Sequence, residues 1–327
     1  MDQVTAVVPN WNRREMLEVL IDRLRAQTYP VSKFVVVDNG STDGSVAAAE
    51  QLGARVVRFD RNLGFAAAVN AGIRECRTAL VAVINNDVEP EPDWLERLAA
   101  ALERDSGAWF AAGKILDARR RDLLDGAWDL ISRGGCAWRA GHGRPDGEAW
   151  NRKRPVQMVP LTATLLRRDL FDKTGLLDER FESYLEDVEF GLRCARAGFG
   201  GLYVPSARAY HWGSATLGRW HPDVVRRIAR NQLLLVAKHY PRWWWYRYGW
   251  AVAVGQALWG LTALRHGAGW ACASGKLEGL RRFAEFRADT ADFGAVEEVL
   301  ASSERELYEL QSQTGFDFYW RLYFALT

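Results

Sequence analysis

The sequence predicts an α/β fold, a doubly wound and mostly parallel sheet with flanking helices, followed by a helical extension. Short apolar runs alternate with helical spacings over the first 90 residues, which is typical of a parallel sheet. A polar or glycine-bearing loop follows each of the four runs. Beyond residue 220 the chain becomes basic and rich in tryptophan, and then acidic. We therefore expect three parts, residues 1–220, 221–287 and 288–327.

The first four strands and their helices can be placed in order. Strands are expected at 4–8, 34–37, 54–59 and 79–84, which are rich in apolar residues. Helices are expected at 14–27, 46–52 and 66–76. Ligands of open α/β sheets bind beyond the carboxyl ends of the strands. The loops after these strands are therefore candidates for a binding site.

The fourth strand ends abruptly in Asn85, Asn86 and Asp87. Two amides and a carboxylate at this edge can hydrogen-bond a sugar or ribose and give a divalent cation one hard oxygen ligand. The alternative is a polar turn that Pro90 and Pro92 close.

The next stretch is less regular. A helix is expected at 93–103 and a strand from 109, followed at 117–155 by a long, partly mobile loop with short strands. Strands at 159–166 and 200–205 and a helix at 168–174 complete the expected sheet. A further helix carries Glu186, Asp187 and Glu189 in its first turn, where carboxylates suit the helix dipole whether or not they have a function. A lone histidine such as His211 is more often structural than a ligand.

Charge and cysteine content limit the surroundings of the chain. The net charge of +2 gives no whole-chain field for nucleic acid. Residues 205–287 hold 13 basic against 3 acidic residues, whereas residues 288–327 hold 2 against 8. The four cysteines are scattered, which favours reduced thiols over disulfides or zinc. The sequence starts with a strand and not a signal peptide, so we expect a cytoplasmic N-terminus.

The segment 221–287 is predicted to meet a membrane surface. Eight of the 15 tryptophans lie between Trp212 and Trp270. Residues 224–239 alternate basic and apolar positions, and residues 249–264 are apolar but shorter than the ~20 residues of a spanning helix. We expect a peripheral or monotopic anchor at the cytoplasmic face of the inner membrane. A buried helical hairpin or an oligomer interface is the alternative. The acidic segment could form a helix at 297–310 and an aromatic cluster at 316–324 that docks on a partner subunit.

Taken together, the motifs resemble those of the family-2 inverting glycosyltransferases of the GT-A fold, in particular the bacterial rhamnosyltransferase-like branch. The resemblance covers roughly residues 3–240. Its blocks are residues 7–12, 35–44, 61–65 with Asn70, 85–88, 177–181, 186–192 and His211. Each block is weakly specific, and their order along the chain is what identifies the resemblance.

The resemblance implies a role for individual residues. Nucleotide contacts are implied for Pro9, Asn10, Asn12, Asp38, Asn62, Gly64, Asn70 and Asn86. Asp187 would be the catalytic base with Glu186 beside it, and Asp87 and His211 would hold Mg²⁺ or Mn²⁺. The chain departs from the family pattern because Asp87 is the single carboxylate of its metal block, so we expect the cation to arrive with the nucleotide. Residues 160–163 also differ from the family's acceptor-side sequence, which leaves the acceptor open.

The function implied is transfer of a sugar, with inversion, from a nucleoside-diphosphate donor to a hydroxyl group of a polyprenyl-linked or other glycan acceptor. L-rhamnose from dTDP-rhamnose is the expected donor sugar, and UDP-hexose or UDP-galactofuranose is the alternative. A sugar-nucleotide-binding subunit without turnover is a second class. A nucleotidyltransferase fits poorly, because residues 9–14 do not form the glycine-rich phosphate loop that it would need.

Overall fold

The computed structural model describes residues 3–213, 218, 220–287 and 293–327. Its first part alternates strands and helices as predicted. The elements are β1 (Val4–Asn10), α1 (Arg14–Arg25), β2 (Val31–Asp38), α2 (Ser45–Gln51), β3 (Arg55–Arg58), α3 (Phe65–Arg74), β4 (Leu80–Ile84), β5 (Val88–Pro90) and α4 (Trp94–Arg104). β4, β1, β2 and β3 lie side by side and are parallel. Their carboxyl ends therefore share one edge of the sheet.

The second part completes a ten-stranded mixed sheet. Its elements are β6 (Phe110–Asp117), β7 (Leu124–Gly126), β8 (Asp129–Ile131), β9 (Ala137–Arg139), η1 (Glu148–Trp150), β10 (Arg154–Val156), β11 (Ala163–Arg167), α5 (Asp169–Thr174), η2 (Glu179–Phe181), α6 (Glu186–Arg196) and β12 (Gly201–His211). β11 runs antiparallel between β4 and β6, and β12 runs parallel to β6. α1, α2 and α4 cover one face of the sheet, and α3, α5 and α6 cover the other. The predicted α/β fold is confirmed.

Several predicted strands have different bounds in the structure, and two of them differ by four residues or more at one end. β11 begins at Ala163 and not at residue 159, because Pro160 has no N–H and the carbonyl of Thr162 accepts a hydrogen bond from the Asn85 N–H at 2.9 Å. β12 continues past Pro205 to His211, because a register shift between Val204 and Arg208 accommodates the proline and pairing with β6 resumes beyond it.

The prediction of a long, partly mobile loop at 117–155 is wrong. The short strands are present, but the segment is packed into the core through Trp128, Trp138 and Trp150, which are all buried. β8 and β9 form a hairpin, and the following helices α10 (Phe293–Thr314) and α11 (Phe318–Leu326) support it. The Ile131 N–H donates to Ser303 Oγ at 2.7 Å, and the Gly134 N–H donates to the Tyr323 hydroxyl at 2.9 Å.

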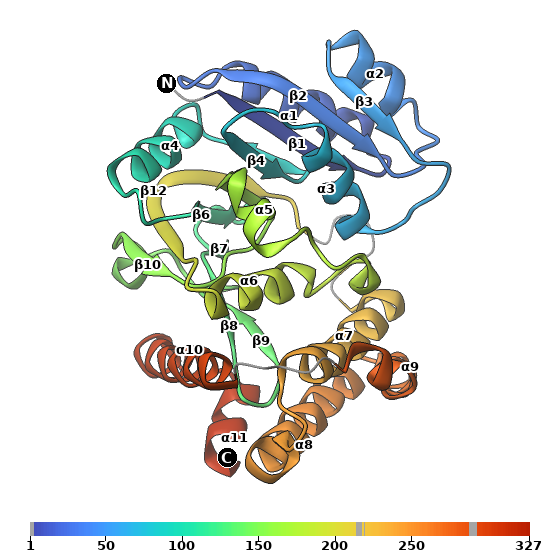
Figure 1. The fold of residues 1–327 in the computed structure, drawn as a ribbon, viewed down its shortest axis with the longest axis vertical. Helices are drawn as coiled ribbons and strands as arrows, with labels where there is room; N and C mark the ends of the chain where they lie inside the picture. Colours follow the sequence, from blue (N-terminus) through green and yellow to red (C-terminus); the bar gives the residue numbers. More distant parts are fainter. Residues whose placement is uncertain (1–2, 214–217, 219, 288–292) are drawn as a thin grey trace.

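The remaining helices form the lower end of the molecule in Figure 1. They are α7 (Pro222–His239), α8 (Trp244–Arg265), α9 (Gly269–Arg282) and the short η3 (Phe283–Phe286), followed by α10 and α11. α9 packs on α7, and α8 contacts both α9 and α11. The helix expected at 297–310 lies within α10, whereas residues 288–292 of the predicted acidic part lie outside the described residues. Trp320 and Tyr323 of the aromatic cluster are buried within this chain.

The basic residues of α7 are not a membrane-facing stripe. The Arg230 side chain is 1% exposed and pairs with Glu182 at 2.8 Å and with Glu278 at 3.0 Å. Lys238 pairs with Asp178 at 2.7 Å. These cations neutralise carboxylates inside the protein, so α7 joins the extension to the α/β part and the lipid-facing interpretation of residues 224–239 is wrong.

The structure also describes the state of the cysteines and the character of the helices. Cys76, Cys136, Cys194 and Cys272 are all free and buried. Within residues 3–213, 218, 220–287 and 293–327, no helix is both long enough and apolar enough to cross a membrane.

Candidate active site

Four of the residues predicted to bind a nucleotide share one hydrogen-bond network at the carboxyl ends of β1, β2 and β4. Asn10 donates to Asp38 Oδ1 at 3.2 Å and accepts from Asn86 Nδ2 at 2.7 Å. The N–H of Asn12 donates to Ser41 Oγ at 2.7 Å. Pro9, the fifth predicted residue here, lies within β1 opposite Val37. The network fixes the side chains that a nucleotide at this edge would meet.

The turn between β1 and α1 is strained and directs an arginine into the site. Asn12 and Arg13 both have positive φ, 58° and 65°, which is costly for residues other than glycine. Asn86 Nδ2 donates to the Asn12 carbonyl at 3.3 Å, and the Thr42 N–H donates to Asn12 Oδ1 at 3.0 Å. These contacts hold the turn, and Arg13 Nη1 then lies 3.1 Å from Asp87 Oδ2.

The two predicted metal ligands are adjacent. Asp87 Oδ1 lies 3.2 Å from His211 Nε2, although 124 positions separate the residues in the sequence. β5 explains the approach, because Val88 at its start pairs with His211 at the end of β12. Both side chains are 12% exposed, so they face the site and are otherwise enclosed.

Asp125 fixes the orientation of His211. Its Oδ2 lies 2.9 Å from His211 Nδ1, so Nδ1–H donates to the carboxylate and Nε2 faces Asp87. Burial alone would lower the pKa of His211, but the charges and hydrogen bonds of Asp125 and Asp87 raise it to about 10. Burial would raise the pKa of Asp125, and the His211 charge instead brings it to about 2. A histidine held by a carboxylate at one nitrogen is the arrangement found at metal sites.

The donor set suits a divalent cation only if other ligands join it. One carboxylate and one imidazole fit Mn²⁺ or Mg²⁺ chemistry, and a cation at Nε2 would replace the proton there. Within the described ranges, no cluster of three or more His, Cys, Asp or Glu side chains could hold a metal ion. Asp87 and His211 therefore fit a cation whose remaining ligands come from a diphosphate and water.

The predicted base lies in a second cluster. Asp187 is the second residue of α6. It accepts from Arg139 Nη2 at 3.2 Å through Oδ2, while its Oδ1 accepts from the Val188 N–H at 2.9 Å. Arg139, at the end of β9, also donates to Asp129 Oδ1 at 3.1 Å and to Thr162 Oγ1 at 3.3 Å. One arginine thus orients two carboxylates. Asp187 remains 14% exposed, whereas Asp129 is 4% exposed.

Two carboxyl groups beside Asp187 hold protons more tightly than usual. Burial raises the pKa of Glu186 well above its ordinary value, and the Asp187 charge adds to the shift. Burial and Asp187 raise the pKa of Asp129 to about 6 against the opposing charge of Arg139. Among the described residues, Glu186 Oε2 and Asp129 Oδ2 are buried without a hydrogen-bond partner. These oxygens could bind hydroxyl groups of a ligand or ordered water.

A second strained turn places Asp187. Glu182, Tyr184 and Leu185 have positive φ between 60° and 70°. Asn231 of α7 holds this turn, because its Nδ2 donates to the carbonyls of Phe181, Ser183 and Tyr184 at 2.6–3.1 Å. Consecutive strained residues persist only where surrounding contacts fix them, and they are typical of functional sites. The extension therefore positions the predicted base.

Thr162 connects the two clusters. Its carbonyl accepts from the Asn85 N–H at 2.9 Å, directly before Asn86 and Asp87, and its hydroxyl accepts from Arg139. Arg139 in turn binds Asp187. The Asp87–His211 pair and the Asp187 cluster are therefore parts of one site at one edge of the sheet.

Of the remaining predicted residues, Asn62 and Gly64 lie beside the Asn10 network and Asn70 lies apart from it. The Gly64 carbonyl accepts from Asn39 Nδ2 at 3.0 Å, and the Asn39 N–H donates to the Asn10 carbonyl at 2.8 Å. Asn62 accepts the Gly64 N–H at 2.9 Å within its own loop. Gly64 has φ +94°, and a Cβ there would lie 2.8 Å from the backbone of Glu182, so this loop packs against the strained turn before Asp187. Asn70 needs correction, because it is buried and its amide is used by the Leu177 backbone at 2.9 and 3.0 Å and by Glu179. Its role is to join α3 to the segment before α6.

Sequence reasoning missed Arg13, Asp125 and Arg139. Arg13 follows the Asn10–Asn12 block directly, so its position was the available signal. Asp125 and Arg139 lie in the irregular 117–155 segment, where neither periodicity nor a motif distinguishes them from other charged residues.

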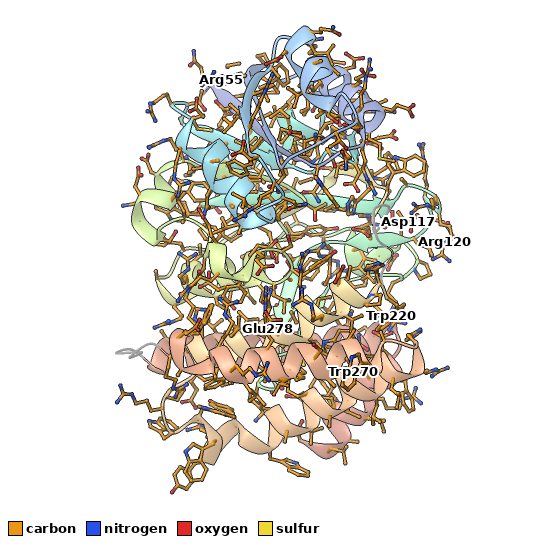
Figure 2. All side chains as sticks on the ribbon, turned by 90° about the vertical axis from the view of Figure 1, so that its right-hand side faces the viewer. Arg55, Asp117, Arg120, Trp220, Trp270 and Glu278 are labelled. Atoms are coloured by element: carbon orange, nitrogen blue, oxygen red, sulfur yellow. The ribbon has the colours of Figure 1, made fainter. Side chains whose placement is uncertain are left out.

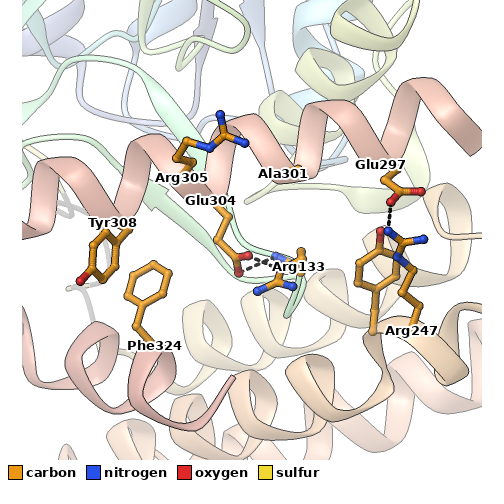
Figure 3. Close-up of a pocket in the computed structure, with 9 residues that line it drawn as sticks. Arg133, Arg247, Glu297, Ala301, Glu304, Arg305, Tyr308 and Phe324 are labelled. Atoms are coloured by element: carbon orange, nitrogen blue, oxygen red, sulfur yellow. Dashed lines mark hydrogen bonds and ion pairs between the residues drawn. The ribbon is translucent and has the colours of Figure 1, made fainter.

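Two cavities of the described residues lie elsewhere. One, of ≈ 320 Å³, lies between α8, α10 and α11 (Figure 3). Four of its five charged side chains pair with one another, as Arg133–Glu304 and Arg247–Glu297. The other, of ≈ 410 Å³, is lined by residues of β10 and β12 among others. Neither contains the clustered carboxylates, and neither is a candidate active site.

Comparison with known proteins agrees with the geometry. The model of the family described as Glycosyl transferase family 2 matches residues 5–175. The N-acetylglucosaminyl-diphospho-decaprenol L-rhamnosyltransferase of Mycobacterium tuberculosis is 27% identical over 271 residues, which cover 74% of this chain and 87% of that protein. The protein y4gI of Sinorhizobium fredii is also 27% identical, over 69% of this chain, but the chain spans only 26% of its length.

A solved structure supports the fold. The crystal structure of GalNAc-T7 with UDP, GalNAc and Mn²⁺ aligns with a TM-score of 0.64 at 14% identity. The alignment covers 97% of this chain and 58% of that one. At this identity the likeness concerns the fold, including the helices that follow residue 220.

Proposed function

The chain belongs to glycosyl transferase family 2, and we propose that it transfers a sugar from a nucleoside-diphosphate donor to a hydroxyl group of a glycan acceptor, with inversion at the anomeric carbon. The observation that carries the proposal is the junction at Thr162, which joins the Asp87–His211 pair to the Asp187 cluster. A transferase of this kind needs a leaving-group site and a base in one site, on opposite sides of the reacting carbon.

The donor would lie along the carboxyl ends of β1, β2 and β4. Asn10, Asn12, Asp38 and Asn86 would contact the nucleoside, with Pro9 beneath it and the Asn62–Gly64 loop near the ribose. Asp87 and His211 would hold Mg²⁺ or Mn²⁺, which supplies charge neutralisation of the departing diphosphate. The Mn²⁺ in the GalNAc-T7 structure supports this assignment by analogy of fold.

Asp187 is proposed as the general base. As the acceptor oxygen forms its bond to the anomeric carbon, its proton passes to the Asp187 carboxylate. The bond from that carbon to the diphosphate oxygen breaks, and its electron pair leaves with the diphosphate. Arg139 holds Asp187 in place, and burial raises the pKa of Glu186 well above its ordinary value. Glu186 and Asp129 would hydrogen-bond further acceptor hydroxyl groups.

The donor sugar and acceptor are proposed from the motifs and from the relative. We assign L-rhamnose from dTDP-rhamnose as donor and a polyprenyl-linked glycan as acceptor, because a relative that the chain nearly spans carries the name of a decaprenol-linked rhamnosyltransferase. Such an acceptor lies at a membrane, so the enzyme would act peripherally at the cytoplasmic face.

The test compares transfer and nucleotide binding in one variant. Asp187→Asn should lower the transfer rate about 10²–10⁴-fold, the usual contribution of a general base. The rise in melting temperature caused by dTDP or UDP with Mn²⁺ should persist, because the nucleotide side is intact. Asp172→Asn, an exposed carboxylate on α5, is the matched control and should leave both readouts unchanged.

Each readout can contradict a different part of the proposal. Loss of both transfer and nucleotide binding in Asp187→Asn would give Asp187 a structural role. Transfer from UDP-sugars but not from dTDP-rhamnose would replace the donor assignment. Nucleotide binding without transfer by the unaltered protein, across donors and acceptors, would favour the sugar-nucleotide-binding subunit.

A further inference from the structure

The outer faces of α8 and α9 are apolar where a helix in contact with water is usually charged. Residues 248–264, most of α8, contain no charged side chain at all. The apolar exposed positions of α8 that recur every three or four residues are Tyr246, Trp250, Ala253, Ala257, Leu261 and Leu264, and Trp245, Arg247 and Arg265 are exposed as well. Those of α9 recur in the same way and include Trp270, Ala273, Leu277 and Leu280. We call these two sets the outer stripes.

The outer stripes are not covered by any described part of the protein. Tyr246 is 77% exposed, Trp250 67% and Trp270 86%. Figure 2 labels Trp270 among the helices at the lower end of the molecule. The opposite face of α9 packs on α7, where a Cβ at Gly275 would lie 2.1 Å from a backbone oxygen. Two charged residues of α9 turn inward, since Glu278 pairs with Arg226 and Lys276 donates to Gln232 at 2.7 Å, whereas Arg281 is exposed. α8 is therefore apolar on both faces, because its buried positions are apolar too, and α9 carries apolar residues outward and small residues on its buried face.

The charges around the outer stripes are basic. Residues 241–287 hold seven Lys or Arg against two Asp or Glu, a net charge of +5. Arg242, Arg265 and Arg281 are exposed beside the stripes. Glu278 pairs with Arg226 and Arg230 and Glu285 pairs with Arg282, so arginines neutralise both acidic residues. An apolar surface with a basic rim is complementary to a bilayer that carries anionic lipid.

We infer that the outer stripes of α8 and α9 bind the surface of an anionic lipid bilayer, with tyrosine and tryptophan side chains in the interfacial region and arginines on the headgroups. A second copy of the chain is a poorer occupant, because a symmetric contact would bring the two basic rims together. The inference rests on the proposed function in one respect, because a lipid-linked acceptor would require the enzyme to reach a membrane. Binding itself needs neither donor nor acceptor.

The experiment measures binding of the full chain to vesicles of phosphatidylcholine with and without phosphatidylglycerol. We expect binding only to the anionic vesicles. Leu261→Glu on α8 and Leu277→Glu on α9 should each weaken it about tenfold or more. Arg265→Gln should weaken it about fivefold. Val19→Glu, an exposed apolar residue on α1, is the matched control and should bind as the unaltered protein does.

Several results would overturn the inference. If Leu261→Glu and Leu277→Glu bound anionic vesicles as the unaltered protein does, the outer stripes would not be the binding surface. If the unaltered protein bound neutral and anionic vesicles equally, the basic rim would have no role in binding. A lipid-free dimer that Leu261→Glu dissociates, without vesicle binding, would make a second copy the occupant. Melting temperature and transfer to a water-soluble acceptor are measured in parallel. Vesicle binding without any sugar transfer would contradict the proposed function but would still support the inference that the outer stripes bind a bilayer.

Discussion

Asp125 provides the sharpest test of the site, because no motif in the sequence identifies it. Its carboxylate accepts from His211 Nδ1–H at 2.9 Å, and this contact directs Nε2 toward Asp87. Asp125→Ala leaves that N–H without its acceptor and frees the ring to rotate. Loss of such a partner typically costs 10–100-fold in metal affinity, or about 1.4–2.7 kcal/mol. We expect a loss of this size here.

The assay is titration with Mn²⁺ at saturating nucleoside diphosphate, followed by the electron paramagnetic resonance signal of the free ion. Nucleotide affinity measured without metal should change little, because the network of Asn10 and Asp38 does not contain Asp125. Asp125→Asn keeps an oxygen that can accept from Nδ1–H, so its loss should be smaller than that of Asp125→Ala.

Asp122→Ala is the matched control, since it removes an exposed carboxylate three residues away and changes the net charge equally. If Asp125→Ala bound Mn²⁺ as tightly as the unaltered protein, or if Asp122→Ala lost as much affinity, the orienting role would be refuted. A fall in affinity with an unchanged melting temperature would separate the role from a general loss of folding.

The other predictions concern stability. Burial would raise the pKa of Asp178, but hydrogen bonds from Arg180 and Lys238 lower it to about 2. Because the pKa of Asp178 is lower in the folded than in the unfolded protein, its interactions with Arg180 and Lys238 stabilise the protein by about 1–2 kcal/mol above about pH 4. This stabilisation is lost as the pH falls toward 2. The free energy of unfolding of Asp178→Asn, measured at each pH, should lack this pH-dependent contribution. A pH profile identical to that of the unaltered protein would contradict the prediction. Gly275→Ala should destabilise by about 1–3 kcal/mol, because its Cβ would meet the α7 backbone at 2.1 Å. Gly260→Ala in α8 has open space and should stabilise by about 0.5–1 kcal/mol, and equal melting shifts for the two variants would refute the packing argument.

The nucleotide side of the site could be predicted because its residues follow regular strands. Asn10, Asp38 and Asn86 each come at or directly after the end of an apolar parallel strand, and parallel strands bring such residues to one edge. Asn70 was misassigned because a buried amide in a motif looks the same in sequence whether it binds a ligand or the backbone of Leu177.

The base side could be predicted only in part. Asp187 stands in a recognisable block at a helix start, but its partner Arg139 comes from a hairpin with no sequence signal. The antiparallel direction of β11 could not be predicted either, because the pattern of apolar residues is the same for parallel and antiparallel strands. The stripe on α7 was misinterpreted because spacing cannot tell whether Arg230 faces lipid or buried carboxylates.

The support of the β8–β9 hairpin by α10 and α11 bears on the order in which the protein becomes active during translation. The backbone N–H groups of Ile131 and Gly134 can form these hydrogen bonds only after Ser303 and Tyr323 have been synthesised. These partners are 172 and 189 residues further along the chain. At ~5–20 residues per second, these partners leave the ribosome about 10–40 s after the hairpin. The hairpin carries Arg139, the partner of Asp187. A nascent chain would therefore complete the candidate nucleotide side well before the arginine that orients the predicted base is held in place.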